Sequence, residues 1–125
     1  MLLFALADSK RLSASAANFL RDRQNEVFVS VVSFWELSLK VSLGKLSLTG
    51  VSPDQLPGYA LSMGFTLLPL AADTACTFHQ LPKIGKHRDP FDRMLVWQAI
   101  REDLALVSPD RAMSAYEACG LSLVW

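Results

Sequence analysis

The chain has 125 residues, which is enough for one domain with a substantial core and too few for two. Apolar residues make up 51% of it and charged residues 19%, so it is too apolar for a disordered protein. Its 12 basic residues are balanced by 12 acidic ones, which excludes nucleic-acid binding that depends mainly on bulk positive charge.

The first half of the chain is predicted to contain helices around one buried strand. Its apolar opening is typical of a helix body, because no capping residue or turn precedes it. Ser13 can cap the next helix, and the β-branched run that follows is almost continuously apolar, as in a buried parallel strand. The predicted elements are helices at 1–7 and 14–23, a strand at 27–32, and helices at 34–43 and 53–64.

The second half alternates between strands and helices, and Asp89 with Pro90 opens its longest helix. Strands that alternate with helices predict an α/β fold, a three-layer α/β/α sandwich with a mainly parallel central sheet. In such sheets the ligand site lies at the carboxyl ends of the strands. The predicted elements are strands at 65–68, 104–107 and 121–124, helices at 72–81, 90–103 and 111–119, and a polar loop at 83–88.

No part of the sequence predicts export or membrane insertion. The apolar opening lacks a basic start and ends at Asp8, and no run approaches the roughly 18 apolar residues of a membrane-spanning helix. Cys76 and Cys119 lack the paired spacing of a zinc site or a redox motif. We therefore expect a cytoplasmic protein with reduced cysteines.

Carboxylates recur where the predicted strands end. Glu36 lies in the first helical turn after the strand at 27–32, and Asp110 follows the strand that ends at 107. Asp89 and Asp92 open the long helix. The carboxyl ends of parallel strands meet at one edge of the sheet, so these four carboxylates are expected to converge.

Structural roles remain open for three of these carboxylates. Ser33 and Glu36 match a capping box, and Glu36 can also pair with Lys40 one turn further on. Asp89 is a natural cap for the long helix, and Asp110 belongs either to a turn or to the start of the last helix.

Asp92 is harder to explain by a structural role alone. It shares a helical stripe with Leu95, Val96 and Ala99, and a buried carboxylate needs a cation or a hydrogen-bond network. A divalent cation relieves the repulsion between converging carboxylates, and ligand sets made only of oxygen favour Mg²⁺ or Mn²⁺. Hydrolysis of phosphodiester bonds is the chemistry that fits such a centre.

Four segments of the sequence resemble PIN-domain ribonucleases, specifically the VapC-type toxins of bacterial type II toxin–antitoxin pairs. They keep the family's order and spacing, and the similarity covers essentially the whole chain. The resemblance implies a single PIN-like domain over 1–125, a metal-dependent endoribonuclease, and an antitoxin partner that holds it inactive. The segments are 29–40 with W-E-x-x-x-K, 44–46, 87–96 with H-R-D-P-F-D-R, and 106–110.

The resemblance also implies roles for individual residues. The family's second, third and fourth acidic residues fall on Glu36, Asp92 and Asp110, and Asp89 is the neighbour of the third. Glu36, Asp92 and Asp110 would be catalytic and, with Asp89, would hold one or two Mg²⁺ or Mn²⁺ ions, with water attacking the scissile phosphate of the RNA. Ser108 takes the position of the family's usual Thr or Ser and is a candidate for substrate binding.

Three basic residues beside the carboxylates are further candidates for substrate binding. His87 and Arg88 either contact a substrate phosphate or belong to a solvated loop, and Arg93 pairs with either a carboxylate or a phosphate. Apolar residues left exposed on the early helices are expected to bind an antitoxin segment and to form a homodimer.

One part of the family's pattern is absent. These toxins begin with a hydrophobic strand that ends in an Asp, and this chain begins within the helix that follows, so we expect the first strand and first acidic residue to be missing. That loss predicts exposed edges on the two neighbouring strands. Either the start of the chain is misassigned, or the protein is a truncated, inactive module that binds an antitoxin or RNA without cleaving it.

Overall fold

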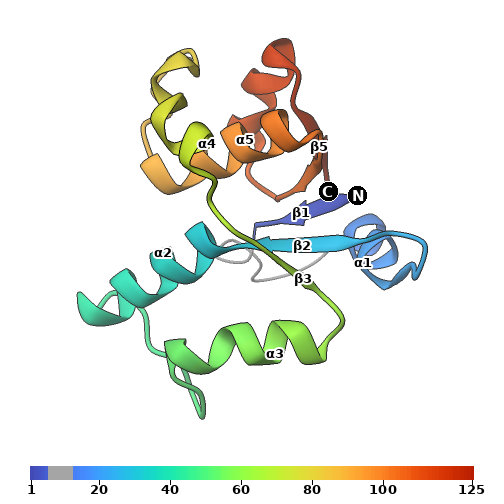
Figure 1. Ribbon diagram of the computed structural model, residues 1–125, viewed down its shortest axis with the longest axis vertical. Helices are drawn as coiled ribbons and strands as arrows, with labels where there is room; N and C mark the ends of the chain where they lie inside the picture. Colours follow the sequence, from blue (N-terminus) through green and yellow to red (C-terminus); the bar gives the residue numbers. More distant parts are fainter. Residues whose placement is uncertain (6–12) are drawn as a thin grey trace.

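The computed structural model describes residues 1–5 and 13–125. Five strands in this part of the chain form one sheet in the order β3-β2-β1-β4-β5, and every neighbouring pair is parallel. Figure 1 shows β1 beside β2, and β5 lies on the other side of β1. The strands are β1 (Leu2–Phe4), β2 (Val27–Ser30), β3 (Thr66–Leu68), β4 (Ala105–Val107) and β5 (Ser122–Val124).

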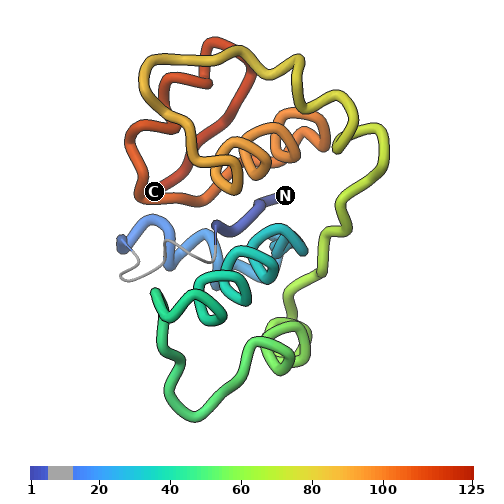
Figure 2. The backbone as a smooth tube through the Cα atoms, turned by 90° about the vertical axis from the view of Figure 1, so that its left-hand side faces the viewer, coloured from blue at the N-terminus to red at the C-terminus, as the bar shows by residue number. Residues whose placement is uncertain are grey.

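Helices connect the parallel strands. Figures 1 and 2 both place α3 and the C-terminal helical segment at opposite ends of the molecule. The α-helices are α1 (Ala14–Arg21), α2 (Val31–Ser42), α3 (Leu56–Ser62), α4 (Ala72–Cys76) and α5 (Pro90–Glu102). The 3₁₀ helices are η2 (Pro53–Gln55), η3 (Phe78–Gln80) and η4 (Arg111–Cys119).

Two hydrophobic clusters lie against the sheet, one on each face. One joins Leu3 and Leu106 of the strands to Leu95 of α5, and the other joins Phe4 of β1 to Ala16 of α1. Helices therefore cover both faces, as in a three-layer sandwich. The predicted α/β class with a parallel sheet is confirmed.

The structure corrects the prediction for the apolar opening of the chain, and also the expectation that the first strand of the fold is missing. Leu2–Phe4 is the central strand of the sheet, not a helix, and its three side chains are buried on alternate faces. A strand covered on both faces is continuously apolar, and periodicity cannot distinguish so short a run from a helix. Because β1 pairs with both β2 and β4, the expected exposed edges do not exist at this position.

The start of α2 also differs from the prediction. The helix begins three residues earlier than expected, and Ser30 is its N-cap, with its Oγ accepting a hydrogen bond from the Val32 amide at 3.0 Å. The Ser30 hydroxyl also donates to Oε1 of Gln98 on α5 at 2.5 Å. Ser33 lies inside the helix, so the predicted capping box of Ser33 and Glu36 is wrong.

Replacing these two serines tests the position of the cap. We expect Ser30→Ala to lower the free energy of unfolding by about 1–3 kcal/mol, because it removes the cap and the donor to buried Gln98. Ser33→Ala should leave stability unchanged or raise it, because its buried Oγ has no hydrogen-bond partner among the described residues. Urea unfolding of both variants measures the difference, and the reverse ranking would restore Ser33 as the cap.

The remaining elements lie close to their predicted positions, with three differences in type. The segment predicted as one helix at 53–64 is divided between η2 and α3, the segment at 72–81 is divided between α4 and η3, and the segment at 111–119 is a 3₁₀ helix. Ser13 caps α1 as predicted, accepting from the Ala16 amide at 3.0 Å. Among the helices of residues 1–5 and 13–125, none is long and apolar enough to cross a membrane.

Candidate metal centre

The four predicted carboxylates converge at the carboxyl ends of the strands. Glu36 comes from α2, which follows β2, and Asp110 follows β4. Asp89 and Asp92 come from the start of α5. Ligand atoms of Glu36, Asp89 and Asp92 lie within 4.8 Å of one another, and those of His87, Asp92 and Asp110 do so as well. Asp92 therefore belongs to both triads.

Glu36 is a buried carboxylate with one oxygen unpaired. Its side chain is 2% exposed, and Oε2 accepts a hydrogen bond from Lys40 Nζ at 2.6 Å, which confirms the predicted pair. Oε1 has no hydrogen-bond partner among the described residues. Burying a charged oxygen without a partner is costly, so a cation beside Oε1 would satisfy it.

Asp89 and Asp110 each cap a helix through Oδ1, which leaves Oδ2 as a potential ligand for a cation. Asp89 Oδ1 accepts from the amides of Phe91 and Asp92, at 2.9 and 3.1 Å. Asp110 Oδ1 accepts from the Ala112 amide at 2.9 Å, whereas its Oδ2 faces His87. The structural and functional interpretations of these two residues are therefore compatible, because each uses a different oxygen.

His87 lies between the carboxylates and the core. Its Nε2 is 3.5 Å from Asp92 Oδ2 and 4.0 Å from Asp110 Oδ2, and its side chain is 12% exposed. Its Nδ1 is 2.9 Å from the hydroxyl of Tyr116, a fully buried residue of η4. Tyr116 could not be identified from the sequence, because the only available signal is that a buried tyrosine hydroxyl needs a partner.

Arg93 and Ser108 have surroundings that differ from the expected substrate contacts. Arg93 is buried and donates to the carbonyl oxygens of Leu81 and Pro82 and to the Tyr116 hydroxyl. Its guanidinium also lies over a phenylalanine ring, 5.0 Å from the centroid. Ser108 is buried too, and its Oγ accepts from the Asp110 amide at 3.2 Å. Arg93 thus holds the Tyr116 hydroxyl and Ser108 holds the backbone of Asp110, on the core side of the site.

Exposed basic side chains border the carboxylates in the loop before α5. Arg88 is exposed, and one of its guanidinium nitrogens donates to the His87 carbonyl at 3.1 Å. Lys86 is exposed in the same loop. These side chains give the site the local positive charge that the balanced overall composition does not provide.

The residues present fit a divalent cation. Their donor atoms are carboxylate oxygens and one imidazole nitrogen, which bind Mg²⁺, Mn²⁺ and related ions. Two of those atoms, Glu36 Oε1 and His87 Nε2, are buried and lack hydrogen-bond partners in the described part of the chain. A cation would give both atoms the electrostatic partner that they lack.

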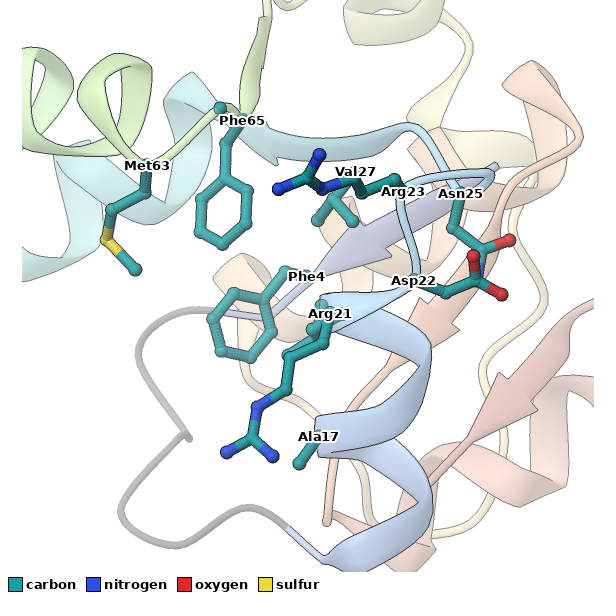
Figure 3. A pocket seen from close by; sticks show the side chains of 11 residues that line it. Phe4, Ala17, Arg21, Asp22, Arg23, Asn25, Val27, Met63 and Phe65 are labelled. Carbon is teal, nitrogen blue, oxygen red and sulfur yellow. The ribbon is translucent and has the colours of Figure 1, made fainter.

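A cavity among the described residues lies elsewhere and is lined by side chains of a different kind. It has a volume of about 620 Å³, and none of the predicted site residues lines it. Figure 3 shows the rings of Phe4 and Phe65 close together in this cavity, with the arginines Arg21 and Arg23 beside them. Among the described residues that line it, Asp22 is the only carboxylate, so this part of the lining does not resemble a metal site.

Comparisons with known proteins agree with this architecture. A family model of the PIN domain matches residues 2–118. The chain is similar to FitAcB from Neisseria gonorrhoeae, with 18% identity, a TM-score of 0.67, and 100% of this chain and 97% of that chain covered. It is also similar to VapBC2 from Rickettsia felis bound to a promoter DNA fragment, with 18% identity, a TM-score of 0.66, and coverage of 99% and 98%.

A toxin–antitoxin complex from Klebsiella pneumoniae is similar as well. Its identity is 18% and its TM-score 0.61, with 100% of this chain and 97% of that chain covered. No curated protein matches the chain. At these identities the solved structures show a shared fold.

Proposed function

This chain belongs to the PIN-domain family, and we propose that it is a VapC-type toxin, a metal-dependent endoribonuclease of a type II toxin–antitoxin pair. The observation that carries the proposal is the convergence of Glu36, Asp89, Asp92 and Asp110 with buried, unpartnered ligand atoms. Nuclease activity is general among PIN domains. In this proposal residues 1–125 form a single PIN-like domain that acts in the cytoplasm.

Glu36, Asp89, Asp92 and Asp110 would hold the Mg²⁺ or Mn²⁺. When bound, the cation would polarise a phosphate and make water more acidic. The chain's own residues keep the carboxylates in place before substrate arrives. Lys40 holds one oxygen of Glu36, and Ser108 holds the backbone of Asp110.

Two further features of the chain support the proposed roles of the carboxylates and of the loop before α5. Asp89 and Asp92 lie at the start of α5, where the helix dipole favours negative charge. In the proposed complex, the exposed Arg88 would contact an RNA phosphate next to these carboxylates.

An apolar stripe on α2 supports an antitoxin partner. Val31, Trp35, Leu39 and Leu43 are exposed at intervals of four residues, and the Trp35 side chain is 63% exposed. Side chains at this spacing share one face of a helix, and an exposed apolar patch of this kind marks an interaction site. The similar solved structures include toxin–antitoxin complexes. We propose that an antitoxin covers this stripe and that neighbouring apolar residues contribute to a homodimer.

Cleavage of RNA by the purified chain tests the proposed activity. We expect cleavage of total cellular RNA in Mg²⁺ or Mn²⁺, a loss of at least about a hundredfold when EDTA removes the cation, and recovery when the cation is restored. Gel analysis of the fragments measures this dependence. Cleavage that persists unchanged in EDTA would contradict the metal-dependent mechanism.

A second candidate function rests on the end of β1. The resemblance places an acidic residue after the first strand, and this chain has the buried Ala5 there. Among the described residues, β1 therefore adds no carboxylate to the site. The alternative is an inactive PIN-like module that binds an antitoxin or RNA. Absence of Mn²⁺ binding by calorimetry, together with tight antitoxin binding, would favour this alternative.

A further inference from the structure

We propose that His87 is a nitrogen ligand of the metal centre, binding the cation through Nε2 together with Asp92 and Asp110. This inference rests on the proposed function, because it concerns the same cation. It adds an imidazole to a site that is predicted from the sequence to consist of carboxylates, and it replaces the expected contact between His87 and substrate phosphate.

The position of Nε2 is the first observation. This atom is buried, has no hydrogen-bond partner among the described residues, and faces two carboxylate oxygens at 3.5 and 4.0 Å. These distances exceed the usual 2.7–3.2 Å of an N–H···O hydrogen bond. Ligand atoms that share one cation at about 2.1 Å lie roughly 3–4 Å apart. The spacing around Nε2 is therefore that of a ligand set.

The second observation is the support for the other ring nitrogen. A metal-binding histidine normally donates its second N–H to a neighbouring acceptor, which fixes the tautomer and the orientation of the ring. Nδ1 of His87 is 2.9 Å from the Tyr116 hydroxyl oxygen. That oxygen has two lone pairs, and Nε of Arg93 donates to one of them at 3.3 Å. The second can accept the Nδ1–H, which leaves the Nε2 lone pair for the cation.

Arg93 fixes this support in place. One of its guanidinium nitrogens donates to the carbonyl oxygens of Leu81 and Pro82, at 3.0 and 3.3 Å. Tyr116 is fully buried, and its ring meets the His87 ring edge to face at a centroid distance of 5.5 Å. The imidazole is thereby oriented before any cation binds, and Arg93 and Tyr116 are positioning residues.

The two triads offer different chemistry to a cation. Glu36, Asp89 and Asp92 provide only oxygen, whereas His87, Asp92 and Asp110 provide nitrogen and oxygen. Imidazole binds Mn²⁺ and later transition metals better than it binds Mg²⁺. We therefore expect His87→Gln to lower the Mn²⁺ affinity at least tenfold and the Mg²⁺ affinity less.

Pulsed electron paramagnetic resonance of the full chain with Mn²⁺ alone tests the inference directly. We expect ¹⁴N modulation from a bound imidazole, and labelling the chain with ¹⁵N-histidine should convert it to the ¹⁵N pattern. This comparison needs no substitution, so it does not depend on the folding of a variant. The chain has only two histidines, and exposed His79 on η3 provides the matched control. The modulation should persist in His79→Gln and vanish in His87→Gln.

The outcomes separate the inference from the function on which it rests. Mn²⁺ binding without histidine modulation would overturn the role of His87 and leave the carboxylate centre standing. Failure of the unmodified chain to bind Mn²⁺ would overturn both. Tyr116→Phe gives a second measurement, because loss of the hydroxyl should lower the Mn²⁺ affinity about 10–100-fold. An unchanged affinity in that variant would contradict the positioning role of Tyr116.

Discussion

Asp92→Asn is expected to abolish metal-dependent RNA cleavage and to weaken Mn²⁺ binding at least about a hundredfold. Asp92 is the one carboxylate shared by both triads, so its neutralisation removes a ligand from each. Asparagine has nearly the same shape, and the surrounding packing should be kept. Calorimetric titration with Mn²⁺ and gel analysis of RNA fragments measure the two effects.

Asp103→Asn is the matched control for this substitution. Asp103 is exposed at the opposite end of the same helix and has a left-handed backbone with φ 54°, which asparagine adopts readily. The same chemical change should leave cleavage and Mn²⁺ binding unaltered there. An Asp92→Asn protein that folds normally and still cleaves RNA in a metal-dependent way would rule out the proposed centre.

Leu3→Ala is expected to lower the free energy of unfolding by about 2–5 kcal/mol, and Phe4→Ala by about 3–5 kcal/mol. Both residues lie in the central strand of the sheet and point into different clusters, so each truncation leaves a cavity in a separate part of the core. Unfolding in urea measures both values. Large losses at two consecutive residues are the signature of a strand covered on both faces.

Met1→Ala provides the comparison for these two truncations. Met1 precedes the strand and is exposed, so its replacement should change stability by no more than about 0.5 kcal/mol. A small effect at Leu3 or Phe4 would contradict the central position of β1. It would instead favour the helix that was predicted from the sequence for this segment.

The carboxylates of the candidate site could be predicted from the sequence. Glu36, Asp89, Asp92 and Asp110 follow predicted strands or open a predicted helix, and parallel topology brings such positions to one edge. The supporting contacts could not be predicted. Tyr116 reaches His87 from a segment 29 residues away, and no local pattern specifies such a contact.

The surroundings of the buried Arg93 could not be predicted from the sequence either. Arg93 is adjacent in sequence to Asp92, so a contact with substrate was a reasonable hypothesis. Successive residues of a helix point about 100° apart, however, and the direction of α5 turns Arg93 toward the core behind the site. Only the packing of α5 on the sheet decides which of two neighbouring side chains reaches the metal centre.

The sequence by itself determined the α/β class, the order of most elements and the four carboxylates, because periodicity, capping residues and strand ends are local properties. The tertiary structure decided that Leu2–Phe4 is the central strand, that Ser30 caps α2, and that Arg93 and Tyr116 orient His87. Each of these depends on a partner that is distant in the chain: β2 and β4 for the strand, Gln98 for the serine, and η4 for the histidine. Such contacts form only when the sheet brings the elements together, and therefore no short stretch of sequence encodes them.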